Sequence, residues 1–257
     1  MKPSALAESL KLSWFQSTAA MASSELQAVK AAIHDIASFY GLEVVGFLRL
    51  DQARTTIPAH EMDLLRGVKW SDGEVSLSNV KNPLEIMPTA KTMVILGKRL
   101  LDDKKDIYYR VSDSYSASIE TMLLDVASLK VIQALEDADF QVAEYTSYYL
   151  KVWAVLAGFG WIGKSRMFVH KNHGPRLRLK AVLTDADIGD IAEVIPDKSC
   201  GDCRECIDAC PVGAIKETEV DRKLCGACKL NHRRVSENAL SYCTQCTAAC
   251  PIGIGKK

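Results

Sequence analysis

The cysteines constrain this chain more than any other feature of its sequence. All nine lie between Cys200 and Cys250 of a 257-residue chain. A disulfide framework would spread its cysteines through the fold and would accompany export. Clustered cysteines without such a framework are typical of metal binding. We therefore expect the C-terminal part of the chain to be organised around metal.

The first cysteine run has the spacing of an iron–sulfur protein. Residues 200–211 read CGDCRECIDACP, the C-x2-C-x2-C-x3-C-P run of bacterial ferredoxins. Three closely spaced thiolates of such a run hold one [4Fe–4S] cubane, and the fourth, before the proline, ligates the other cluster. Zinc prefers four ligands in tetrahedral pairs and fits this spacing poorly. The run predicts two clusters rather than zinc.

The second run is incomplete. Residues 243–251 read CTQCTAACP, with Leu240 where a first cysteine would fall, and either Cys225 or Cys228 can replace it. One cluster is then assigned to Cys200, Cys203, Cys206 and Cys250. The other takes Cys210, Cys243, Cys246 and one of the two candidates. The ninth cysteine is left either as a free thiol or as an alternative ligand.

Hydrophobic spacing before residue 200 predicts both helices and strands. Helices are expected over 24–40, 118–137 and 150–157, and strands over 44–50, 92–97, 167–170 and 176–183. Because these elements show no regular βαβ alternation, we predict an α+β core. We place this core at residues 1–197 and the double-cluster module at 198–257, with the acidic stretch 185–197 as the join.

Charge and hydropathy indicate a cytoplasmic protein that does not enter a membrane. Thirty-two basic residues balance thirty-two acidic ones, so no net field favours nucleic acid or an anionic membrane. The most apolar stretch, 148–163, is interrupted by Lys151 and is shorter than the roughly 20 residues that a bilayer requires. Residues 1–14 lack the pattern of a secretory signal.

A glycine-rich motif imitates a nucleotide site. Residues 158–165, GFGWIGKS, satisfy both the dinucleotide fingerprint and the phosphate-loop pattern. Both motifs require a strand before the glycines and a helix after them, and here the expected order is reversed. The glycines then serve either a tight helix-to-strand turn or a backbone platform against a flat cofactor. An ATP-hydrolysing protein is the least favoured interpretation.

Residues 153–164, the strand region through 183–185 and the two cysteine runs together resemble the epoxyqueuosine reductases. More weakly, they resemble the corrinoid-dependent reductive dehalogenases. The resemblance covers about residues 40–251. It implies a nitroreductase-like core that binds cobalamin (B12) instead of flavin, and two [4Fe–4S] clusters that deliver electrons to the cobalt. It also implies an oxidoreductase supplied by a soluble donor such as ferredoxin or flavodoxin.

The resemblance also implies roles for particular residues. It makes Cys225 the eighth cluster ligand and places the glycine motif beside the corrin, through Gly158, Gly160, Trp161, Gly163 and Lys164. The aspartate that serves as proton donor in epoxyqueuosine reductases falls on Glu144 here. The dehalogenases use a tyrosine, for which Tyr145 and Tyr148 are candidates. Glu144 could instead cap the following helix or form a salt bridge.

The substrate is left open between a small molecule and a tRNA-borne group. The sequence ends at Lys257, without the helical-repeat extension common in epoxyqueuosine reductases, so a short form is expected. Residues 164–184 hold six basic residues and no acid. This strip could contact phosphates or an acidic ferredoxin, or it could be a solvated hairpin face. The alternative function is a cobalamin-reducing or electron-transfer protein without a substrate of its own.

Overall fold

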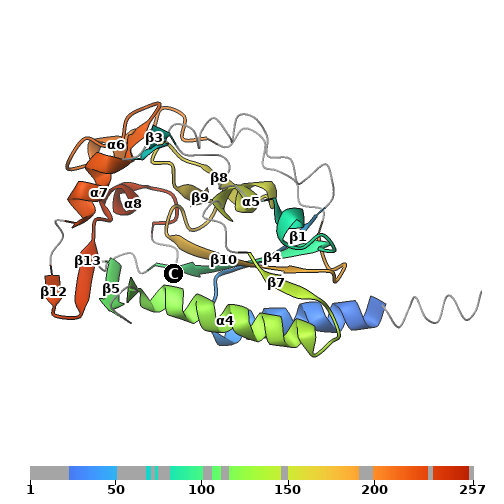
Figure 1. Ribbon diagram of the computed structural model, residues 1–257. Coiled ribbons are helices and arrows are strands. Elements are labelled where there is room, and N and C mark those ends of the chain that lie inside the picture. The colour runs from blue at the N-terminus through green and yellow to red at the C-terminus, as the bar shows by residue number, and fades with distance from the viewer. Residues whose placement is uncertain are drawn as a thin grey trace, which may run out of the picture.

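A four-stranded antiparallel sheet forms the centre of the core (Figure 1). The computed structural model describes residues 23–50, 68–70, 73–74, 82–100, 106–110, 116–145, 150–190, 199–230 and 234–254. The strands follow the order β1 (Val44–Arg49), β4 (Thr92–Arg99), β10 (Leu177–Thr184) and β7 (Val142–Glu144). All three pairs are antiparallel, which agrees with the absence of a βαβ rhythm in the sequence.

Both faces of this sheet are covered, because successive side chains of a strand point to opposite faces. On one face, Phe47, Val94 and Val182 pack with the helix over 23–39 and with α4 (Ile119–Glu136). On the other face, Leu48, Met93 and Leu183 pack with α5 (Leu150–Leu156). Figure 1 shows the two long helices on one side and α5 on the other. The mixed helix-and-sheet class predicted from the sequence is confirmed.

Local signals fix where the core helices begin and end. Ser118 caps α4 by accepting a hydrogen bond from the Thr121 backbone N–H at 3.3 Å. The short helix α3 (Pro83–Ile86) begins in the same way, with the Asn82 side chain accepting from Leu84 N–H at 3.0 Å. None of the helices that the structure describes is long and apolar enough to cross a membrane.

The glycine motif forms a helix-to-hairpin connection, as expected. Helix α5 ends before Gly158, which has φ +74°. Strand β8 (Gly160–Ile162) then pairs antiparallel with β9 (Phe168–His170). A strand therefore follows the glycines where a phosphate loop requires a helix, and the nucleotide interpretation is rejected on the geometry.

The part of the chain that contains the cysteines, described over 199–230 and 234–254 and here called the cysteine segment, lies at one end of the core (Figure 1). Its elements are α6 (Glu205–Asp208), β11 (Val220–Asp221), α7 (Arg222–Leu230), β12 (Arg234–Ser236), β13 (Ala239–Tyr242) and α8 (Gln245–Ala249). The remaining short strands are β2 (Val68–Trp70), β3 (Gly73–Glu74), β5 (Asp106–Arg110) and β6 (Ser116–Ala117).

Two strands of the cysteine segment pair with strands from earlier in the chain. Strand β13 pairs antiparallel with β5, and β11 pairs parallel with β2. The division between residues 197 and 198 stays a prediction. Backbone pairing nevertheless joins the cysteine segment to the preceding residues, so the segment is not connected to them through a linker alone.

Candidate functional site

The nine cysteines gather into two neighbouring sets. The first, which we call the four-cysteine set, contains Cys200, Cys203, Cys206 and Cys250. Burial raises the pKa of the Cys206 thiol to about 11, and the nearby thiols of the set and of Cys246 add to the increase. Burial also raises the pKa of Cys250, with Cys200 and Cys203 contributing. The two cysteine runs, distant in sequence, thus meet in space.

The second set surrounds a cavity of about 210 Å³, here called the cluster cavity. Its five thiols, the five-cysteine set, come from the loop after α6, from α7 and from the segment around α8: Cys210, Cys225, Cys228, Cys243 and Cys246. The Ala214 backbone N–H donates to the Cys210 sulfur at 3.3 Å. Such N–H···S hydrogen bonds are among the features that tune an iron–sulfur cluster.

The five-cysteine set, whose members line a cavity, has the arrangement that a polynuclear cluster requires. Within the described residues, no three His, Cys, Asp or Glu side chains are grouped so that they could hold one metal ion. Zinc would draw four ligands to about 2.3 Å from one centre. Thiols spread around a cavity instead fit a cubane, in which each iron takes one thiolate.

A buried arginine joins the core to the four-cysteine set. Arg176 is 3% exposed, and its guanidinium donates to the carbonyl oxygens of Ala248 (3.0 Å), Cys250 (2.9 Å) and Ile252 (2.7 Å). The turns on either side are in close contact, because a Cβ on Gly174 would lie 2.0 Å from the Ile252 oxygen. Arg176 therefore positions the backbone around the predicted ligand Cys250.

Most basic side chains of the strip over 164–184 have interaction partners within the protein. Arg166 is 3% exposed and donates to the Thr218 carbonyl. The other pairs join Lys164 to Glu217 (2.9 Å), Lys180 to Asp125 (2.6 Å) and Glu144 (2.7 Å), and Arg178 to the Tyr108 hydroxyl. Only Lys171 of the six is exposed. The solvated-face interpretation is therefore wrong for the two buried arginines, Arg166 and Arg176, while Lys164, Arg178 and Lys180 are half-buried and paired within the protein.

A second cavity, here called the core cavity, lies beside the cluster cavity. It has a volume of about 340 Å³, and its walls come from α5, β9 and β10, the residue after β7 and the β8–β9 loop: Tyr145, Leu150, Lys151, Met167, Phe168, Leu177, Arg178, Leu179 and Lys180. Met167 and Arg178 line both cavities. Apolar walls with a few polar groups are typical of cofactor sites.

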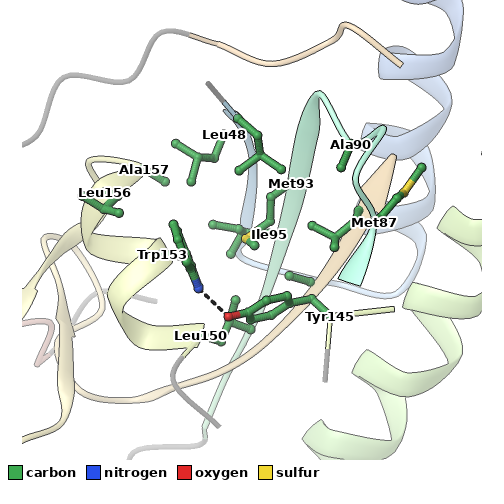
Figure 2. Close-up of a cluster of buried hydrophobic side chains, with 13 residues drawn as sticks. Leu48, Met87, Ala90, Met93, Ile95, Tyr145, Leu150, Trp153, Leu156 and Ala157 are labelled. Atoms are coloured by element: carbon green, nitrogen blue, oxygen red, sulfur yellow. Dashed lines mark hydrogen bonds between the residues drawn. The ribbon is translucent and has the colours of Figure 1, made fainter. Parts of the chain in front are cut away.

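Tyr145 is the predicted proton donor that reaches the core cavity. It is 3% exposed, and its hydroxyl oxygen accepts a hydrogen bond from Trp153 Nε1 at 2.6 Å (Figure 2). The two rings meet edge to face at a centroid distance of 6.3 Å. Glu144 is exposed and forms an ion pair with Lys180 of β10. The salt-bridge alternative is therefore correct, but the partner lies on a strand and not at the start of a helix. Tyr148 lies outside the described residues.

Lys151 is a functional candidate that the sequence interpretation missed. It lines the core cavity, and its Nζ donates to the Arg166 carbonyl at 2.8 Å. Burial, followed by the charges of Arg222 and Arg166, lowers the pKa of Lys151 to about 7. The available signal was one lysine in the otherwise apolar helix LKVWAVL. A half-buried charge whose pKa is strongly lowered marks a candidate site.

Two glycines of the motif are required by close packing within the β8–β9 hairpin. A Cβ on Gly160 would lie 1.9 Å from the Val169 oxygen, and one on Gly163 would lie 2.8 Å from Val169 Cγ2. The hairpin therefore requires both glycines. None of the five predicted corrin-binding residues is among those lining the two cavities, as far as the described residues define them. Their contact with a corrin stays a prediction, although Trp161 Nε1 is a buried donor without a partner in the described part of the chain.

Solved structures with this fold include two groups of reductases. Epoxyqueuosine reductase from Bacillus subtilis matches with a TM-score of 0.62 and 19% identity over 90% of this chain and 67% of that chain. A catabolic reductive dehalogenase matches with a TM-score of 0.54 and 14% identity over 86% of this chain and 31% of that chain. At these identities the similarity establishes the shared fold.

The similar curated proteins are epoxyqueuosine reductases. That of Prochlorococcus marinus (strain NATL2A) is 29% identical over 157 residues, which are 61% of this chain and 48% of the relative. That of Synechococcus sp. (strain RCC307) is 41% identical over 76 residues, or 29% and 23% of the two chains. The matches thus span between about a quarter and about half of the relatives' length. No family model matches the chain. The resemblance predicted from the sequence is confirmed.

Proposed function

We propose that this chain is a corrinoid- and iron–sulfur-dependent reductase of the cytoplasm. The observation that carries the proposal is the shared wall between the cluster cavity and the core cavity, formed by Met167 and Arg178. A cluster bound at the five-cysteine set would therefore be close enough to transfer electrons to a group bound in the core cavity. The similarity to epoxyqueuosine reductases supports a corrinoid as that occupant.

Each part of the site takes a distinct role. The four-cysteine set would hold the cluster that receives electrons from a soluble ferredoxin or flavodoxin, and the five-cysteine set would hold the cluster next to the core cavity. A corrinoid bound there supplies low-valent cobalt for reduction. The chain would contribute the apolar side chains Leu150, Phe168 and Leu177, against which part of the macrocycle would pack.

Reduction of a substrate also requires a positioned proton. Tyr145 is the best-placed of the predicted donors, because it lines the core cavity and Trp153 fixes the position of its hydroxyl oxygen. Lys151 lines the same cavity, and its pKa of about 7 would allow its ammonium to return a proton to the donor near neutral pH. Glu144 is the second choice, since Lys180 already holds its carboxylate.

The substrate class follows from the relatives rather than from a basic surface. One structural neighbour was solved with an epoxyqueuosine-modified tRNA stem loop. We take this tRNA-borne epoxide as the first substrate to assay and a small molecule as the second. The pairing of the basic strip within the protein favours neither.

A cobalamin-reducing protein without its own substrate is the second candidate function. It is favoured by one observation, the ion pair that engages the counterpart of the relatives' acidic proton donor, Glu144. Tyr145 at the core cavity favours the enzyme instead.

Cobalamin binding under anaerobic conditions tests the proposed function. We expect the absorption spectrum of added cobalamin to shift on binding, and the bound cobalt to be reduced once reduced ferredoxin is added. Turnover of the stem loop would then distinguish the enzyme from the cobalamin-reducing protein. Protein with intact clusters that leaves the cobalamin spectrum unchanged would overturn both candidates.

A further inference from the structure

The cluster cavity has one thiol more than a cubane needs. Four irons take four thiolates, and five cysteines line this cavity. Three of them have fixed places in the two cysteine runs, namely Cys210, Cys243 and Cys246. The choice for the fourth ligand is between Cys225 and Cys228, and the surroundings of these two decide what the spare thiol does.

Both candidates lie on one face of one helix. They are three residues apart on α7, which spans nine residues, and side chains at this spacing are neighbours on a helix surface. The Asp221 carboxylate accepts a hydrogen bond from the Leu224 N–H at 2.9 Å and so fixes the start of the helix. Since both thiols line the same cavity, neither is turned away from a cluster held there.

Cys228 also contacts the ligands that are not in doubt. Its thiol is hydrogen-bonded to Cys243 and lies close enough to Cys225 and Cys210 to interact with them electrostatically. A free thiol remote from the cluster would not have these neighbours. Cys225 in turn interacts with Cys246. The two candidates therefore approach the cavity from the same helix and reach different known ligands.

We propose that Cys225 and Cys228 are interchangeable ligands of the same iron, so that the cluster in this cavity keeps four thiolates when either cysteine is missing. The inference rests on the proposed function only in requiring that a cluster is bound at the five-cysteine set. Exchange is balanced without an oxidant or reductant. One thiol loses its proton and binds the iron, while the departing thiolate takes up a proton.

Iron and sulfide analysis of four anaerobically prepared variants tests this proposal. Cys225→Ala and Cys228→Ala should each keep about eight iron and eight sulfide per chain, as two cubanes require. The double variant should fall to about four of each. The matched control is Cys243→Ala, which removes a ligand of the same cavity that has no substitute and should also fall to about four. Alanine is used because a serine oxygen could itself bind iron.

Electron paramagnetic resonance of the reduced variants supplies a second measurement. The two single variants should show different signals from this cluster, since a different cysteine ligates the iron in each. If one single variant falls to about four iron while the other keeps about eight, the surviving cysteine is the sole ligand and the proposal is wrong. Wild-type protein with no cluster at this cavity would instead overturn the proposed function.

Discussion

Lys151 is the residue whose environment departs furthest from that of an ordinary surface charge. Its ammonium lies beside the core cavity with two guanidinium groups nearby, Arg166 and Arg222, and Arg178 and Lys180 line the same cavity. Its pKa is lowered from 10.5 to about 7, primarily by burial. Between these values the unfolded chain binds more protons than the folded one. Stability therefore rises with pH across this window and is lost as the pH falls toward 7.

Replacing Lys151 by methionine should remove that dependence. We expect the thermal midpoint of the wild-type protein to rise from about pH 7 to about pH 9 by more than that of Lys151→Met. Lys171→Met, a change at an exposed lysine, is the matched control and should behave as the wild type does. Equal pH dependence in all three proteins would mean that Lys151 is charged and solvated in the native state.

The two neighbouring candidates for proton donor can be separated by their conservative variants. Tyr145→Phe keeps the ring and removes the hydroxyl, and we expect stem-loop turnover to fall about 10²-fold or more with cobalamin binding and iron content unchanged. A stability loss of about 1–3 kcal/mol should accompany it, since Trp153 Nε1 loses its acceptor. Glu144→Gln should lose only its ion pair with Lys180. The opposite pattern, a dead Glu144→Gln and an active Tyr145→Phe, would restore the acidic donor of the relatives.

At the scale of elements, the contact between two turns positions the four-cysteine set. The turn over 171–175 belongs to the core and the turn over 251–254 follows the last cysteine. Arg176 donates to three carbonyl groups around Cys250, and Gly174 allows the backbones to approach. Because these carbonyls are held by one side chain, the placement of a cluster ligand depends on a residue outside the cysteine segment.

Arg176→Ala should therefore release one cluster. Iron per chain should fall from about eight to about four, because Cys250 loses its fixed backbone while the five-cysteine set is unaffected. Arg176→Lys should rescue it only in part, since an ammonium lacks the planar fork of a guanidinium. Lys171→Ala on the same turn should keep both clusters. Full iron content in Arg176→Ala would show that the cysteines alone place this cluster.

For the whole molecule, the proposed function requires electrons to pass from the four-cysteine set to the five-cysteine set and on to the core cavity. Anaerobically prepared protein should contain about eight iron and eight acid-labile sulfides per chain. Stoichiometric zinc, or only about four iron, would contradict the assignment of two cubanes to the cysteine segment.

The sequence by itself determined the features that depend on spacing along the chain. Apolar residues at helical intervals predicted α4, alternation predicted β10, and the reversed order around the glycine motif argued against a phosphate loop. The cysteine spacing divided the ligands into two sets, with the ninth thiol left open. These patterns are local, and the physics that produces them acts over a few residues.

Only the tertiary structure decided which polar groups leave water. Arg176 and Lys151 look like surface charges in the sequence, yet Arg176 is buried and Lys151 is half-buried, each in contact with a segment more distant in the chain. Glu144 pairs with Lys180 because β7 and β10 are neighbours in the sheet, which no local pattern specifies. The burial of a charge depends on what packs over it, and that packing is set by strand order and by the cysteine segment folding back onto the core.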